Sequence, residues 1–315
     1  MRGSVSPKLE AFLVQVNAAI SEAKSNNVTF TPEQTRINLN NLSAFMPQGP
    51  KIAKVINRHL KAHNREIPVT IYNPAPEKQL PVLIHYHGGG HMCGSVELYD
   101  PVSRNLASIC QCIVICVEYR LAPEHPYPAG IDDCQQVLMR YKELLTDMAY
   151  CEQVYIAGDS AGGAICTTLT QRSITNSDLK IDKQILIYPS VDYSMSSASM
   201  DKNGQGFLLE QEKIKWYFEQ YFQNNTINDE FIKSVSPLNG AFAKTMPKTL
   251  LFTCGCDPLR DEGVAYGQAL RNAGVEVESI HFEGMIHAYM LLYSLVEEEC
   301  QQTYHSIANF LSKTA

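Results

Sequence analysis

The pentapeptide at residues 158–162, with the sequence GDSAG, constrains the fold of this chain more than any other segment. A short β-rich run at 153–157 precedes it, and small residues that open a helical pattern follow at 163–166. A G-x-S-x-G segment in this context is typical of a sharp strand-to-helix turn that exposes a serine hydroxyl at the top of a sheet. The glycines leave room for the turn, because side chains there would collide with the neighbouring strand or helix. The segment therefore predicts Ser160 as a nucleophile.

The pentapeptide also has a plainer interpretation, in which the Ser160 hydroxyl only caps the helix that follows a tight turn. A bare match to this pattern leaves the two interpretations about equally balanced. The segments that precede and follow the turn have to decide between them.

Apolar runs of strand length recur along the chain and alternate with helical patterns. The runs lie at 67–72, 82–86, 112–117, 154–157, 184–188, 249–253 and 276–282. Several are nearly continuous in Val, Ile and Leu, as expected for parallel strands that are covered on both faces. Between them, apolar residues such as Ile131, Cys134 and Leu138 fall at helical spacing. This alternation predicts an α/β fold with a doubly wound, mostly parallel sheet.

Two stretches interrupt the alternation. Residues 1–45 have a helical pattern with one apolar face, and residues 192–240 form an insertion with many aromatic side chains. We expect both to form a cap over the carboxyl ends of the strands, where open α/β sheets bind ligands. The core would then consist of 46–191 and 241–315. The alternatives are an N-terminal helix docked on the core and an insertion that is only a surface excursion.

The composition limits which binding partners and which cellular location we expect for this protein. The 315 residues carry a net charge of −7 without a cluster of Lys or Arg, which argues against nucleic acid or a membrane surface as a partner. We see no signal-peptide pattern, and no apolar run approaches the ~18 residues that cross a bilayer. The ten cysteines lie mostly in apolar runs, as buried thiols of a reducing compartment do. We therefore expect a cytoplasmic protein, and no metal site, because C-x-C pairs lack the spacing of a zinc knuckle.

A glycine loop upstream supports the nucleophile. The apolar run 82–86 leads into His87–Gly90, with the sequence HGGG, where three residues without side chains let backbone N–H groups turn inward. Such groups stabilise the oxyanion that forms when a carbonyl is attacked. The N–H of Ala161, at the helix start just after Ser160, would be the complementary donor.

An acid and a histidine downstream complete the set. Asp257 follows the run 249–253, at the carboxyl end of a strand, where the acid of a triad belongs in such a fold. Asp261 and Glu262 lie one turn later, in the first turn of the following helix, where carboxylates favour the helix dipole. His287 lies in a loop before the last helix, and its imidazole can bridge the acid and the serine. The order Ser, Asp, His differs from that of the chymotrypsin and subtilisin types.

Nine histidines compete for the role of base. Only His287 combines a loop at a strand end with the correct order, whereas His85, His87 and His91 crowd the glycine loop. We expect His87 to brace that loop through a hydrogen bond. The others fit packing, surface or turn positions: His281 in the last strand, His305 in the last helix, His125 in a Pro-rich turn, and His59 and His63 ahead of the first strand.

Together these motifs resemble the hormone-sensitive-lipase-like (family IV) carboxylesterases of the α/β-hydrolase fold, in particular the bacterial short-chain esterases. The matching segments occur in the order of the family: His87–Gly90, Tyr119–Ala129, Gly158–Gly163, Asp257–Gly263 and Gly284–His287. They run from about residue 80 to the C-terminus. The resemblance implies an α/β-hydrolase fold with an N-terminal cap, and hydrolysis of small esters without cofactor or metal.

The resemblance also implies a role for each matching residue. It assigns Ser160, Asp257 and His287 to the catalytic triad. It assigns the N–H groups of Gly89, Gly90 and Ala161 to the oxyanion hole, with Gly88 as a further candidate. The triad would transfer the acyl group to the serine and then to water.

Three residues depart from the pattern of the family. His91 stands where an aromatic residue often follows the glycine loop, Ala164 replaces a common Asn, and Ala288 replaces the Gly that usually follows the catalytic histidine. We expect the last two to be packing changes. His91 either packs in the same way or places a second imidazole near the substrate.

Two other functions fit parts of the pattern. An amidase or peptidase would use the same triad, because preference for ester or amide depends on the pocket. A ligand-binding receptor on a hydrolase scaffold is the alternative from another class, but the plant gibberellin receptors of this kind have lost the histidine that His287 supplies here. The acyl length and the oligomeric state stay open. The resemblance allows a homodimer through the edge strand at 276–282.

Overall fold

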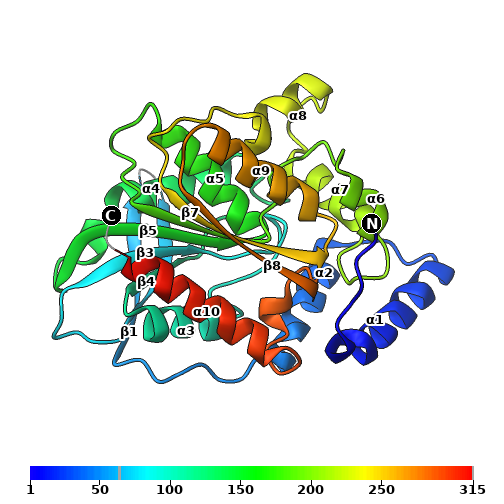
Figure 1. Ribbon diagram of the computed structural model, residues 1–315, viewed down its shortest axis with the longest axis horizontal. Coiled ribbons are helices and arrows are strands. Elements are labelled where there is room, and N and C mark those ends of the chain that lie inside the picture. Colours follow the sequence, from blue (N-terminus) through cyan, green and yellow to red (C-terminus); the bar gives the residue numbers. More distant parts are fainter. Residues whose placement is uncertain (63–64, 314–315) are drawn as a thin grey trace.

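The computed structural model describes residues 1–62 and 65–313, and within them the chain forms one eight-stranded sheet (Figure 1). Its spatial order is β1-β2-β4-β3-β5-β6-β7-β8. The strands are β1 (Lys54–Ala62), β2 (Arg65–Asn73), β3 (Leu80–Tyr86), β4 (Ile113–Val117), β5 (Tyr150–Asp159), β6 (Lys183–Ile187), β7 (Lys248–Cys256) and β8 (Val277–Ile286). β1 and β2 pair antiparallel to their neighbours, and all other pairs are parallel. The predicted doubly wound, mostly parallel sheet is confirmed.

The seven apolar runs correspond to β2 through β8, but β1 has no counterpart among them. Residues 54–62 lie at the edge of the sheet and are mostly half-buried or exposed, so they lack a continuous apolar run. His59, which was expected ahead of the first strand, lies within β1. That expectation was wrong because β1 itself was missed, and His63 lies outside the described residues.

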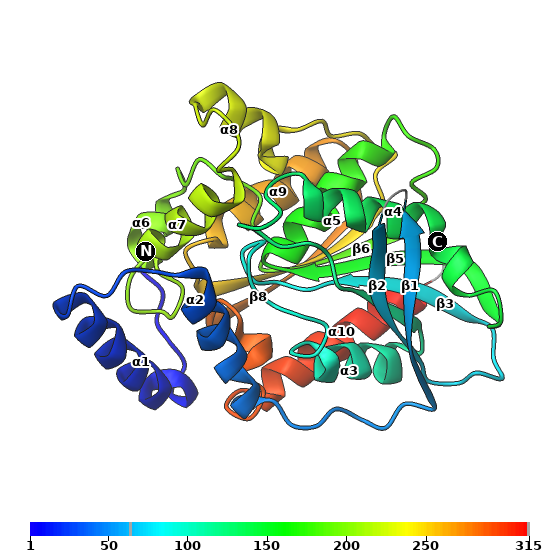
Figure 2. The same cartoon turned by 180° about the vertical axis from the view of Figure 1, so that it is seen from behind.

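Helices cover both faces of the sheet (Figure 1 and Figure 2). α3 and α10 pack against each other on one face, and α4, α5 and α9 cover the other. The helices of the described residues are α1 (Pro7–Ser25), α2 (Pro32–Asn40), α3 (Asp100–Cys110), α4 (Ala129–Leu144), α5 (Ala161–Ser173), α6 (Ala198–Asn203), α7 (Gln211–Tyr221), α8 (Asp229–Val235), α9 (Arg260–Asn272) and α10 (Glu297–Ser312), with 3₁₀-helices η1 (Asn41–Phe45), η2 (Pro237–Asn239) and η3 (Tyr289–Leu291).

Alternate residues of the central strands contribute to two separate cores. Leu83 of β3 and Val114 of β4 pack on the side of α3 and α10, whereas Ile84 and Ile115 pack on the side of α4, α5 and α9. This is the period of two that a strand imposes on its side chains. Because helices cover both faces, both sets of side chains are apolar, and the run becomes continuous.

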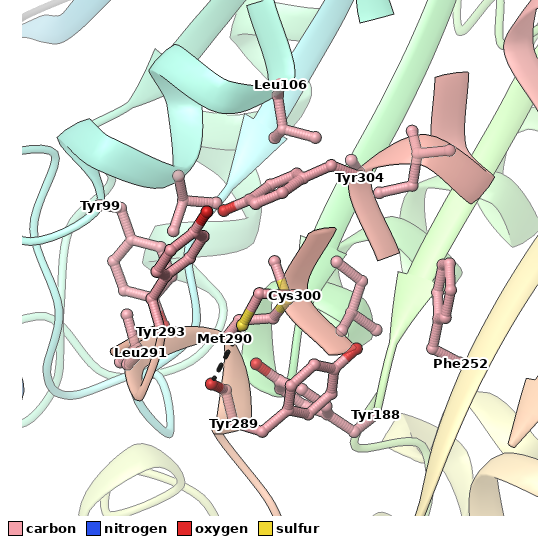
Figure 3. Packing of buried hydrophobic residues seen from close by; sticks show 14 of the residues in the cluster. Tyr99, Leu106, Tyr188, Phe252, Tyr289, Met290, Leu291, Tyr293, Cys300 and Tyr304 are labelled. Carbon is pink, nitrogen blue, oxygen red and sulfur yellow. Dashed lines mark hydrogen bonds between the residues drawn. The ribbon is translucent and has the colours of Figure 1, made fainter. Parts of the chain in front are cut away.

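The first of these cores holds the chain that follows β8. Tyr289 is fully buried there among aromatic and aliphatic side chains (Figure 3). Its hydroxyl hydrogen-bonds to Thr303 Oγ1, and its carbonyl accepts a weak hydrogen bond from Cys300 Sγ at 3.6 Å, both from α10. Since Tyr289 lies just beyond His287, this packing anchors the loop that carries the histidine.

Residues 1–45 and 192–240 both lie at the end of the sheet where the parallel strands end (Figure 1 and Figure 2). Lys24 of α1 pairs with Glu210, just before α7, at 2.7 Å and links the two segments. α1 also buries Leu9 and Leu13 in the core, so it docks on the core as well as lying at this end. The division of the chain into core and cap stays a prediction.

In the described part of the chain, no helix is both long and apolar enough to span a membrane. All ten cysteines belong to this part, and each is a free thiol. Burial raises the pKa of the Cys116 thiol to about 12, so it stays protonated and unreactive at neutral pH.

Candidate active site

Ser160 lies in a strained turn between β5 and α5. Its φ of 53° and ψ of −117° fall outside the regions that non-glycine residues usually adopt. The turn is possible because the glycines around it lack side chains. A Cβ at Gly162 would overlap the carbonyl oxygen of Tyr86, and a Cβ at Gly158 would overlap the carbonyl of Gly162. The predicted strand, sharp turn and helix are therefore present, and they hold the Ser160 side chain at the wall of a pocket.

The structure brings Ser160, His287 and Asp257 together. The Nε2 atom of His287 lies 2.8 Å from Ser160 Oγ, and its Nδ1 atom lies 2.8 Å from Asp257 Oδ2. This arrangement fits the tautomer in which the hydroxyl donates to Nε2 and Nδ1–H donates to the carboxylate. Asp257 is fully buried, and its other oxygen accepts a hydrogen bond from the Leu259 N–H at 2.8 Å. These contacts fix the orientation of both the acid and the imidazole.

The two alternative acids have other contacts. Asp261 and Glu262 lie in the first turn of α9, as expected. Asp261 pairs with Arg260 at 2.7 Å. Glu262 is buried and accepts hydrogen bonds from the N–H groups of Val191 and Asp192, and burial holds its pKa well above the usual range. Asp257 is thus the acid that contacts the imidazole of His287.

Two of the three glycine N–H groups of the loop have no acceptor among the described residues. Gly89 and Gly90 have positive φ values of 121° and 63°, a backbone region that favours glycine. Among the described residues, the N–H groups of Gly89, Gly90 and Ala161 have no acceptor, and all three residues line the pocket beside Ser160. They are free to bind an oxyanion there.

Gly88 does not fit the oxyanion hole. Its N–H donates to Asp159 Oδ1 at 2.8 Å and is therefore occupied. The sequence does not show this contact, because the acceptor of the Gly88 N–H is a carboxylate more than seventy residues away in the chain. We correct the assignment of Gly88 from donor to anchor of the loop.

Asp159 is the functional residue that sequence reasoning missed. It is buried, and its Oδ2 accepts a hydrogen bond from the Tyr99 hydroxyl at 2.9 Å while its Oδ1 holds Gly88. Burial raises the pKa of Asp159 from 3.8 to about 6, although the hydrogen bond from Tyr99 opposes that shift. The one available signal was its place beside Ser160 in the pentapeptide. Asp159 ties the turn of the serine to the glycine loop.

Two histidines near the glycine loop have packing contacts. His87 Nδ1–H donates to the Gly88 carbonyl at 2.8 Å, and its ring stacks on Tyr119 with the centroids 4.4 Å apart, so the predicted brace is present. His91 stacks on Tyr221 at 4.0 Å and hydrogen-bonds through Nε2 to the Tyr193 hydroxyl at 3.1 Å. Burial lowers the pKa of His91 to about 3, so it stays neutral at physiological pH. It also lines the pocket.

The pocket has a volume of about 860 Å³ and is mainly apolar. Ser160, His287 and the glycine loop line it together with residues of α1, α2 and α7. Such a volume accommodates a small molecule. Among the described residues, no cluster of three or more His, Cys, Asp and Glu side chains is arranged to hold a metal ion.

The order of the sheet and the strained turn after β5 define the class of α/β hydrolases. The family described as alpha/beta hydrolase fold matches residues 83–291. The chain is 34% identical over 239 residues to an ethyl acetate hydrolase of Pseudomonas putida, covering 74% of each chain. It is also 34% identical to the carboxylesterase NlhH of Mycobacterium tuberculosis, covering 77% of each.

The solved structures that this chain resembles are also those of ester hydrolases. An ester hydrolase from the metagenome of Lake Arreo matches with a TM-score of 0.86 and 29% identity over 98% of each chain. An esterase of Pyrobaculum calidifontis matches with a TM-score of 0.83 and 27% identity, again over 98% of each chain. The chain belongs to the α/β-hydrolase fold family, and its resemblance to the hormone-sensitive-lipase-like carboxylesterases is confirmed.

Proposed function

We propose that this protein is a serine carboxylesterase that hydrolyses small-molecule esters through Ser160, His287 and Asp257. The observation that carries the proposal is the His287 imidazole, which lines an apolar pocket and lies 2.8 Å from both the serine hydroxyl and the buried carboxylate. The family supports it, because the relatives described above are named as ester hydrolases.

The geometry suits a reaction in two steps. Nε2 of His287 accepts the proton of Ser160 as the serine oxygen attacks the ester carbonyl, and the same proton then leaves with the alcohol. Water attacks the acyl-enzyme in the second step, again with His287 as base, and the acid product leaves. Asp257 keeps the imidazole in the required tautomer and stabilises its charged form.

The N–H groups of Gly89, Gly90 and Ala161 would bind the oxyanion of each tetrahedral intermediate. Each such donor typically contributes about 10²- to 10³-fold to kcat, because it is aimed at charge that develops only in the transition state. The Gly88 N–H takes part indirectly, since its hydrogen bond to Asp159 holds the loop in place.

The test of the nucleophile is Ser160→Ala, with Ser103→Ala as the matched control. Ser103 is also a buried serine, but it hydrogen-bonds to His85 and does not line the pocket. We expect Ser160→Ala to lower kcat on p-nitrophenyl acetate roughly 10³- to 10⁶-fold, and the control to retain activity. Near-full activity in Ser160→Ala would refute the assignment.

Two further assays separate the alternative functions. Comparison of p-nitrophenyl acetate with the matching anilide distinguishes an esterase from an amidase, which needs to protonate a leaving nitrogen. Covalent labelling by an organophosphate distinguishes an enzyme from a receptor, because only an activated serine reacts. Rates over p-nitrophenyl esters from acetate to palmitate would test our further proposal that short acyl chains are preferred.

We also propose a cytoplasmic location and a homodimer through β8. The ten free thiols support the first, since they suit a reducing compartment. For the second, β8 pairs as a strand only with β7 within the described residues, and on its other edge the Ser6 N–H reaches only the Gly284 carbonyl near its end, so the part of the edge before it is open to a second copy. Light scattering of the purified protein would measure the oligomeric state.

A further inference from the structure

The pocket that contains Ser160 also carries a charge that ester hydrolysis does not require. Lys213 of α7 lines the pocket and is partly buried there. Among the described residues, no carboxylate oxygen lies within 4.0 Å of its ammonium nitrogen. The neighbouring cations differ in this respect, because Lys24 pairs with Glu210 at 2.7 Å and Arg36 pairs with Glu124 at 2.6 Å.

The position of Lys213 is unfavourable for a cation in two ways. It is the third residue of α7, and the amino end of a helix repels positive charge. Burial also lowers its pKa, because the pocket wall replaces part of the hydration of the ammonium group. A lysine kept in such a place without a carboxylate partner points to an anion that is supplied by a ligand.

Aromatic rings keep the ammonium group in place. Its nitrogen lies 4.8 Å from the ring centroid of Phe30, 5.8 Å from that of Tyr217 and 6.0 Å from that of Trp216. Cation–π attraction of this kind stabilises a charge without neutralising it. The cation therefore remains available to a negatively charged group in the pocket.

Polar side chains of α2 line the same pocket, and one of them contacts Lys213. The Lys213 ammonium donates to Thr35 Oγ1 at 3.1 Å, and the Thr35 hydroxyl then has its own proton left to donate. Gln34 donates to Asn38 Oδ1 at 2.9 Å, which leaves the NH₂ group of Asn38 as a further donor. All four residues line the pocket. An ammonium group and two neutral donors in one pocket match the acceptor-only oxygens of a carboxylate.

The side chain of Tyr217 contacts both this cluster and the glycine loop. A Cβ at Gly90 would lie 2.8 Å from the Tyr217 ring, so the ring packs directly on the glycine loop. The Lys213 ammonium nitrogen lies 5.8 Å from the centroid of the same ring. Ser160 and Lys213 line one pocket, so an ester bound at Ser160 shares that pocket with the ammonium group.

We propose that Lys213, Thr35 and Asn38 bind a carboxylate on the substrate, so that the preferred esters are monoesters of dicarboxylic acids. This proposal rests on the proposed ester hydrolysis. Ser160 attacks the ester end of such a molecule, while the carboxylate end stays ionised and unchanged. The apolar wall between the two sites contacts the methylene chain.

The experiment compares kcat/KM for charged and neutral esters of equal length. The monoethyl esters of succinic, glutaric, adipic and suberic acids are the charged set, and ethyl esters of the matching monocarboxylic acids are the neutral set. Acetate esters of hydroxy acids, which carry the carboxylate on the alcohol side, form a third set. The ratio of charged to neutral kcat/KM is the readout, because a general loss of folding cancels in it.

We expect one charged ester to exceed its neutral counterpart, and Lys213→Gln to lower that ratio roughly 10- to 100-fold, since a charged hydrogen-bond partner is lost. Lys215→Gln, two residues along α7 and outside the pocket, should leave the ratio unchanged. In the wild-type protein, NaCl should raise KM for the charged ester more than for the neutral one.

Other outcomes separate this proposal from the one on which it rests. A wild-type ratio near or below one for every length overturns the carboxylate site, while hydrolysis of the neutral esters upholds the esterase. An unchanged ratio in Lys213→Gln also overturns it. A preference only for acetates of hydroxy acids would refute the monoesters as substrates. No hydrolysis of any ester, p-nitrophenyl acetate included, would overturn the proposed function itself.

Discussion

The buried carboxyl of Asp159 should make the stability of the protein depend on pH in a specific way. Burial raises its pKa from 3.8 to about 6, so the folded protein retains a proton over a range in which the unfolded chain has released it. The contribution of Asp159 to stability is therefore full below about pH 4 and is lost as the pH rises through about 6. At about 1.4 kcal/mol per pKa unit, the loss amounts to about 3 kcal/mol.

Asp159→Asn removes the charge and keeps the hydrogen bonds. The amide oxygen still accepts from the Gly88 N–H, and the amide NH₂ donates to the Tyr99 oxygen in place of the reverse bond. The variant should match the wild type in free energy of unfolding near pH 4 and exceed it by about 3 kcal/mol at about pH 8. Urea titrations of both proteins across this pH range measure the difference between their free energies of unfolding. The other titratable groups are the same in both proteins, so their contributions cancel in that difference.

Parallel pH profiles for the two proteins would refute this reasoning, because the carboxyl would then titrate alike in the folded and unfolded states. Asp159→Ala provides the contrast. It leaves the Gly88 N–H without its acceptor, which costs about 1–3 kcal/mol at every pH. It also frees the glycine loop, so kcat should fall by up to roughly 10²- to 10³-fold, as when an oxyanion donor is lost.

Two further substitutions test other contacts. Lys183→Met should lower the free energy of unfolding by about 1–3 kcal/mol. The reason is that the Lys183 ammonium donates hydrogen bonds to three carbonyls at the end of α10, those of Phe310, Leu311 and Lys313. An unchanged thermal midpoint would contradict that role. His91→Phe retains the stacking on Tyr221 but leaves the buried Tyr193 hydroxyl without its partner, which should cost about 1–3 kcal/mol. The variant should leave the pH dependence of kcat/KM unchanged, and a changed pH dependence would show that His91 takes part in the chemistry.

Much of the fold could be predicted because the parallel strands are buried on both faces. Runs such as 82–86 and 112–117 are continuous in apolar residues for that reason, and they stand out in the sequence. β1 could not be found in the same way. It lies at the edge of the sheet, where one strand of a hairpin needs few buried side chains, so residues 54–62 show only a weak pattern.

The candidate site, too, could be predicted only in part. Ser160, Asp257 and His287 each follow a strand, so the order of the strands places them at one edge of the sheet before any contact is known. Gly88 was assigned wrongly because sequence shows that an N–H group exists but not where it points. Lys213 could not be found at all, since its place in the pocket depends on how α7 and α2 meet across 178 residues of chain.

The residues that line the pocket come from two parts of the chain, one inside and one outside the region that matches the family. The N-terminal helices α1 and α2 lie outside the region 83–291 that matches the family, whereas Ser160 and His287 lie inside it. Ion pairs of Lys24 and Arg36 link these helices to the rest of the molecule, but α1 also buries Leu9 and Leu13 in the core. A chimaera that exchanges the first 45 residues with those of a relative would therefore have to keep apolar side chains at these two core positions. Such a chimaera would exchange one wall of the pocket and inherit the reaction chemistry unaltered.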